Sequence, residues 1–168
     1  FWPESRHLRS RQLPVEATVV LDDVSLVTDR YEGTSDVTVI LLHGGGGHGR
    51  LLRPFASPLH AAGHTVVVPD LPNFGRAPSR RDVTFDDWVR WVSALVDHEH
   101  HPHRFVVVYG LSVGGMTAYH VAAENPLVGQ VFATTLADMR RPEVRRAAAR
   151  HASMAQWFYP VAAAAPAI

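Results

Sequence analysis

Four short, nearly continuous apolar runs alternate with helical patterns along this chain, and this alternation constrains its fold more than any other feature. The runs are Val37–Leu42, His64–Val68, Phe105–Tyr109 and Val128–Leu136. A strand that is apolar along its whole length is typical of a parallel sheet with helices on both faces. Because short connections join the alternating elements, the sequence predicts a doubly wound, mostly parallel α/β sheet.

The elements around these runs extend the prediction. Two β-branched runs, Val15–Leu21 and Val24–Thr28, predict an antiparallel hairpin at the edge of the sheet. Thr84 is a good N-cap for a helix, and its apolar residues recur at the spacing of one helical face. We expect that face to fill the core rather than to form a ligand platform. Helices are predicted over Leu51–Ala62, Thr84 to about His98, Val113–Glu124 and Pro142–Met154.

Gly110-Leu111-Ser112-Val113-Gly114 fits the pattern G-x-S-x-G between an expected strand and an expected helix. In this setting the pattern predicts a sharp turn that presents the serine hydroxyl at the edge of the sheet. Glycines are needed because a Cβ on either side of the turn would collide with neighbouring backbone. We therefore expect Ser112 to be a nucleophile, with the N–H of Val113 as one donor to a developing oxyanion.

A second glycine-rich segment, His43-Gly44-Gly45-Gly46-Gly47-His48-Gly49, follows the first of the four apolar runs. An oxyanion needs another backbone N–H, from a loop that approaches the substrate without side chains in the way. Gly45 is the first candidate donor and Gly46 the second, and His48 is a candidate for lining the substrate pocket. The alternative is a phosphate-binding loop, but no G-K-[ST] follows. For His43 we expect a role in bracing the loop rather than that of general base.

These motifs together resemble the α/β-hydrolase family, and within it the lysophospholipase and monoacylglycerol-lipase-like branch. The resemblance covers roughly residues 15 to 137 and rests on HGGGGHG, on PDLPNFGR at positions 69–76 and on GLSVGG, each after a strand. It implies a serine hydrolase that cleaves carboxylic, lipid-like or other acyl esters through an acyl-enzyme, without a cofactor. It also implies an N-terminal extension (1–14), a hydrolase core (15–137) and the beginning of a cap (138–168).

The remaining catalytic residues of that family come later in the chain, in the order serine, acidic residue, histidine. The histidines after Ser112 are His120, eight residues along the same expected helix, and His151, in the expected cap. Neither is placed to take the serine proton. Asp138 is a candidate acid, with a first cap residue or helix N-cap as its alternative. We therefore expect the histidine base to lie outside this stretch, and residues 1–168 alone to be nearly inactive.

Several other functions remain as alternatives or are excluded. A ligand-binding relative without a triad is one alternative, and a peptidase, thioesterase or C–C hydrolase on the same scaffold is another. A haloalkane dehalogenase is disfavoured because those enzymes use aspartate at the elbow. A net charge of 0 lacks the basic excess that nucleic-acid binding needs.

Composition also bears on metals, membranes and location. The chain has no cysteine, and we expect the histidines from His98 to His103 to form a solvated loop rather than a metal site. No apolar run approaches the ~18 residues of a membrane helix, and the first residues lack the apolar core of a signal peptide. A cytoplasmic location is therefore expected, and the resemblance to the α/β-hydrolase family implies a small-molecule ester as the substrate. Both ends look cut, so we expect a fragment whose strand Val128–Leu136 leaves an open sheet edge.

Overall fold

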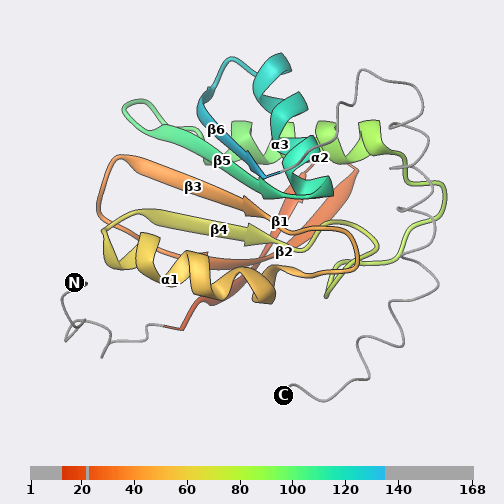
Figure 1. The fold of residues 1–168 in the computed structure, drawn as a ribbon, viewed down its shortest axis with the longest axis horizontal. Coiled ribbons are helices and arrows are strands. Elements are labelled where there is room, and N and C mark those ends of the chain that lie inside the picture. The colour runs from red at the N-terminus through yellow and green to blue at the C-terminus, as the bar shows by residue number, and fades with distance from the viewer. Residues whose placement is uncertain (1–12, 22, 135–168) are drawn as a thin grey trace.

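A computed structural model describes residues 13–21 and 23–134 as an α/β structure built on a six-stranded mixed sheet (Figure 1). The strands lie in the order β1-β2-β4-β3-β5-β6. Their bounds are β1 Val15–Leu21, β2 Val24–Tyr31, β3 Val37–Leu42, β4 Thr65–Pro69, β5 Phe105–Leu111 and β6 Val128–Thr134. The helices are the 3₁₀ turn Gly49–Leu52, α1 Arg53–Ala61, α2 Phe85–Glu99 and α3 Val113–Glu124.

The sheet has a parallel part and an antiparallel edge, as expected. β4, β3, β5 and β6 run parallel to one another, while β1 and β2 form an antiparallel hairpin. β2 continues to Tyr31, beyond the expected end at Thr28, because its second half pairs antiparallel with β4. The hairpin is thereby joined to the parallel strands by backbone hydrogen bonds.

Helices cover the two faces of the sheet, with α1 on one and α2 and α3 on the other (Figure 1). Because successive side chains of a strand point to opposite faces, each parallel strand contributes to two cores. In β3, Ile40 and Leu42 pack with α2 and α3, whereas Val39 and Leu41 pack with Ala56 of α1. This two-sided burial explains why these runs are apolar throughout.

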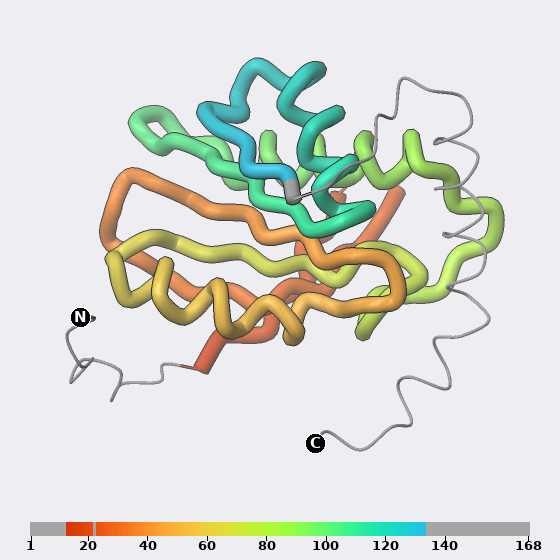
Figure 2. Tube along the Cα trace, in the orientation of Figure 1, coloured from red at the N-terminus to blue at the C-terminus, as the bar shows by residue number. Residues whose placement is uncertain are grey.

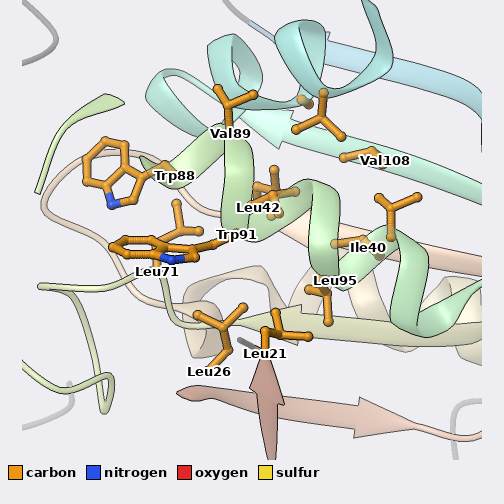
Figure 3. Close-up of a cluster of buried hydrophobic side chains, with 14 of the residues drawn as sticks. Leu21, Leu26, Ile40, Leu42, Leu71, Trp88, Val89, Trp91, Leu95 and Val108 are labelled. Carbon is orange, nitrogen blue, oxygen red and sulfur yellow. The ribbon is translucent and has the colours of Figure 1, made fainter. Parts of the chain in front are cut away.

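The apolar stripe of α2 is part of the core, as expected. Trp88, Trp91 and Leu95 are buried in the same cluster as Ile40 and Leu42 of the sheet (Figure 3). Thr84 caps the helix, because its hydroxyl accepts a hydrogen bond from the N–H of Asp87. In return, the Asp87 carboxylate accepts a hydrogen bond from the N–H of Thr84. Such a capping box satisfies two backbone donors at the start of the helix.

One helix differs from the sequence expectation. The expected helix Leu51–Ala62 divides into the 3₁₀ turn and α1, because Pro54 fits only within the first turn of an α-helix. Within the described residues β6 lies at an edge of the sheet, as expected of this strand, and its Phe132 is 53% exposed. α1 lies over β4 rather than over β6.

Some expectations fall outside the described residues. These include the end of the strand Val128–Leu136, the helix Pro142–Met154 and the proposed cap. In the part of the chain that the structure describes, no helix is long and apolar enough to cross a membrane.

Candidate active site

The glycine loop and the serine motif emerge side by side at one edge of the sheet. β3 and β5 are parallel neighbours in a register that pairs Leu42 with Gly110. The residues that follow each strand therefore leave the sheet at the same edge, where the loop after β4 also lies (Figure 2). In open α/β sheets this carboxyl edge is where ligands bind.

Ser112 occupies a strained turn between β5 and α3. Its backbone angles are φ 54° and ψ −118°, a positive φ that side-chain-bearing residues rarely adopt. Holding a serine there costs about 1–3 kcal/mol, so the surrounding contacts must over-determine it. The residue is exposed, and its hydroxyl has no hydrogen-bond partner among the described residues.

The two glycines of the motif are required by close backbone contacts, as expected. A Cβ on Gly110 would overlap the backbone of Gly114 and Gly115, where α3 begins. A Cβ on Gly114 would overlap the carbonyl oxygens of Leu42 and His43 at the end of β3. These contacts press the first turn of α3 against the sheet and force the chain through the Ser112 conformation.

The glycine loop touches the serine turn directly. A Cβ built on Gly44 would stand 3.3 Å from the Cβ of Ser112. The next residues form a tight turn, in which the N–H of Gly47 donates to the carbonyl of Gly44 at 3.1 Å. Gly46 has φ 75°, the positive value that the third residue of a type II turn requires.

Backbone donors near Ser112 divide into bonded and unbonded groups. The N–H of Gly47 is used within the turn, whereas those of Gly45 and Gly46 have no acceptor among the described residues. The N–H of Val113 also has none, because the first N–H groups of a helix lack an intrahelical partner. The candidate donors therefore lie on exposed loop backbone and at the start of α3.

His43 is a brace rather than a free base. It is buried, and its Nε2 accepts a hydrogen bond from the N–H of Leu71 at 3.1 Å. Its Nδ1 lies 2.8 Å from the carbonyl oxygen of Gly44 and donates to it. In the neutral form of the ring, one nitrogen donates and the other accepts, so both are engaged in hydrogen bonds. Burial lowers the pKa of His43, which also favours the neutral form.

The other sequence candidates are less closely placed. His120 lies far along α3, with its ring against Phe85 at 5.4 Å between centroids, and does not bond to Ser112. His48 is half-buried at the start of the 3₁₀ turn, without a side-chain hydrogen bond to that turn. Asp138 and His151 lie outside the described residues. No general base therefore accompanies Ser112 in the part of the chain that is described.

Sequence reasoning did not assign a role to Asp70 and Arg76. The Asp70 carboxylate accepts hydrogen bonds from the N–H of Gly49 at 2.5 Å and from Nε of Arg76 at 2.8 Å. One signal was available: an acidic residue directly after a buried strand lies at the same edge as the glycine loop. The hydrogen-bond partners of Asp70 could not be predicted from its neighbours in the sequence, because Gly49 is 21 residues away.

The described residues offer no metal site, and their two grooves lie away from Ser112. Among the described residues, no cluster of histidine and carboxylate side chains is arranged to hold a metal ion. The exposed His101 and His103 lie before β5, at the sheet edge opposite Ser112. A polar groove of about 650 Å³ runs between α2 and α3, and an apolar one of about 520 Å³ lies between α1 and the sheet. Neither is lined by Ser112.

Comparison with known proteins identifies relatives over most of the chain. The family model described as alpha/beta hydrolase fold matches residues 37–160. A haloalkane dehalogenase of Psychrobacter cryohalolentis is 36% identical over 99 residues, which cover 56% of this chain and 32% of that protein. Lipase LipV of Mycobacterium tuberculosis is 35% identical over 115 residues, covering 68% of this chain and 42% of the lipase.

The same comparison extends to solved structures. The alpha/beta hydrolase GrgF from Penicillium sp. sh18 superposes with a TM-score of 0.65 at 16% identity, covering 91% of this chain and 56% of that one. At 16% identity, this similarity shows a shared fold and nothing more specific. The matched stretch spans only 32% and 42% of the lengths of the two curated relatives.

Proposed function

Because the chain belongs to the alpha/beta hydrolase fold family, we propose that the protein is a serine hydrolase that cleaves carboxylic esters through an acyl-enzyme on Ser112. One observation carries the proposal: Ser112 stands exposed in a left-handed turn, directly against Gly44 of a glycine loop. This arrangement puts a hydroxyl beside unbonded backbone N–H groups. Acyl transfer needs both in one place.

The proposed chemistry assigns one role to each group. The Oγ of Ser112 bonds to the ester carbonyl carbon, and the N–H groups of Val113 and Gly45 stabilise the resulting oxyanion, with Gly46 as second choice to Gly45. A histidine outside residues 1–168 takes the serine proton and passes it to the departing alcohol. Water then attacks the acyl-enzyme to release the acid and restore Ser112. Asp138 remains the candidate acid that orients the histidine.

The dehalogenase relatives raise a specific alternative that the elbow residue disfavours. Those enzymes use an aspartate carboxylate at this position, and this chain has Ser112 there. A carboxylate displaces halide from a saturated carbon, whereas an activated hydroxyl is suited to attack a carbonyl. The nucleophile therefore supports acyl transfer, the class to which a lipase belongs.

The proposed substrates are esters with an apolar acyl group. Leu111, which precedes the nucleophile, is 39% exposed, and Leu51, which is 59% exposed, stands beside the glycine loop. A Cβ on Gly47 would be 3.4 Å from the side chain of Leu51. An exposed leucine next to Ser112 in the chain and another beside the glycine loop offer contact to a hydrocarbon chain.

The test compares ester and halide chemistry in one preparation of the full-length protein. It should hydrolyse p-nitrophenyl esters, and brief incubation followed by intact-mass measurement should show one acyl adduct. Bromoalkanes should release no bromide above background. Bromide release without ester cleavage would contradict the proposal, as would ester turnover without an adduct on the peptide that contains Ser112.

A further inference from the structure

The glycine loop is anchored at both ends by two adjacent residues of the loop after β4. At its start, the N–H of Leu71 donates to Nε2 of His43 at 3.1 Å. At its end, the N–H of Gly49 donates to Oδ1 of Asp70 at 2.5 Å. Between these anchors the segment touches Ser112 and carries the candidate oxyanion donors. Its position therefore depends on where Asp70 and Leu71 are held.

Asp70 is buried and surrounded by donors. Besides Gly49, its carboxylate accepts from the backbone N–H of Arg76 at 2.7 Å and from Nε of Arg76 at 2.8 Å. A Cβ on Gly75 would overlap this carboxylate, so the loop closes around it only with glycine there. Both carboxylate oxygens thus accept hydrogen bonds from N–H groups, Oδ1 from Gly49 and Oδ2 from Arg76.

Arg76 extends this anchor to the antiparallel hairpin. Its Nη1 donates to the carboxylate of Asp29 on β2 at 2.6 Å and to that of Glu16 on β1 at 2.7 Å. Burial alone would raise the pKa of Asp70, but the hydrogen bonds from Arg76 and Gly49 hold it below its usual value. The carboxylate is therefore ionised when it holds Gly49, and a charge-assisted bond is stronger than a neutral one.

We infer that Asp70, held in place by Arg76, is a positioning residue that sets the glycine loop against Ser112 through the N–H of Gly49. This inference rests on the proposed function, since it assigns Asp70 to the oxyanion donors of that reaction. Asp70 touches no reacting atom. Its effect is on the geometry of the transition state, where a displacement of about 1 Å can cost ~10²-fold in rate.

The decisive variant is Asp70→Asn in the full-length protein. An amide has one acceptor oxygen, and its NH₂ group must face either Gly49 or Arg76, both of which present donors. We expect kcat to fall about 10- to 100-fold with KM within about 3-fold. The inhibition constant of a trifluoromethyl ketone, whose serine adduct carries an oxyanion, should rise by a similar factor. A merely structural role would leave these quantities unchanged in the folded fraction.

Glu99→Gln is the matched control. It makes the same chemical change in a buried carboxylate that accepts hydrogen bonds from an arginine, but that arginine is Arg30, which has no described bond to Asp70 or Arg76. We expect it to lower the melting temperature while kcat stays within about 3-fold of wild type. Equal kcat in the folded fractions of Asp70→Asn and Glu99→Gln would overturn the inference.

Two further variants keep the result decisive. If Asp70→Asn does not fold, Arg76→Lys retains the positive charge without the two-pronged contact, and kcat should fall about 10-fold; an unchanged kcat would again overturn the inference. Ser112→Ala separates the two proposals. Activity that survives in it overturns the proposed function, whereas an inactive Ser112→Ala beside an unaffected Asp70→Asn overturns the positioning role alone.

Discussion

Gly44 lies directly against Ser112, with only 3.3 Å between the Cβ of Ser112 and the place where a Cβ on Gly44 would stand. The contact brings the glycine loop after β3 and the serine turn after β5 together through backbone atoms. It follows from the pairing of β3 with β5, which aligns the ends of the two strands. The next residues, Gly45 and Gly46, are exposed and their N–H groups have no acceptor among the described residues, so both stay candidate donors to a substrate at Ser112, with Gly45 the first choice.

Gly45→Val tests the oxyanion assignment. A branched side chain on this exposed loop should crowd the substrate or turn the N–H away, which should lower kcat by ~10²–10³. The melting temperature should change little, because the residue lies outside the core. Steady-state kinetics and thermal unfolding of the same preparation give both numbers. Lost stability with intact activity in the folded fraction would indicate a structural loop instead.

Gly110→Ala tests the packing of α3 against the sheet. The new Cβ would overlap the backbone of Gly114 and Gly115, so we expect a loss of about 3 kcal/mol or more in the free energy of unfolding. Gly46→Ala is the comparison, since its Cβ would meet nothing within 4 Å and only its φ of 75° is unfavourable. That variant should lose about 1–2 kcal/mol. Urea unfolding that ranks the two in the opposite order would contradict the described contacts.

The positive φ of Ser112 predicts that glycine is tolerated at this position better than alanine. Glycine adopts a positive φ without the steric cost that alanine keeps, although it loses more backbone entropy on folding. Ser112→Gly should therefore be more stable than Ser112→Ala by about 1 kcal/mol. Both variants lack the hydroxyl, so the comparison isolates the backbone. Equal unfolding midpoints would show that the turn is unstrained.

His43 predicts a loss of stability in acid. Burial lowers its pKa in the folded protein below the ordinary 6.5. As the pH falls below 6.5, the unfolded chain therefore binds a proton that the folded protein does not, and folding becomes less favourable. Through this residue, the free energy of unfolding should fall by up to about 1.4 kcal/mol for each pH unit below that point. His43→Gln should lack it, so the stability difference between wild type and variant should shrink from pH 7.5 to pH 5; a constant difference would exclude the effect.

Local patterns were enough to predict the strands, the helix after Thr84 and the serine turn. In each case the signal lies within one element: apolar runs in β3 and β5, a cap followed by a stripe in α2, and two glycines around Ser112. The exposure of Phe132 fits the open edge expected at this strand, but its extent depends on which elements cover each face of β6, and residue type alone does not give that.

The hydrogen bonds that link Arg76 to distant parts of the chain could not be predicted from short sequence patterns either. The bond from Arg76 to Asp29 spans 47 residues and joins a loop to the hairpin. Its presence follows from the antiparallel pairing of β2 with β4, which brings the two segments together. A sequence pattern identifies an aspartate after a strand, but the donors around it become apparent only once the strand order is known.

Labelling with a fluorophosphonate probe tests the central claim most directly. The full-length protein and its Ser112→Ala variant should be treated side by side, with esterase activity and the labelled peptide measured for each. We predict that wild type is labelled on Ser112, and that the variant loses both label and activity, with kcat reduced by ~10⁴ or more. Labelling at another residue, or esterase activity that survives in a folded Ser112→Ala variant, would contradict the assignment of Ser112 as the nucleophile.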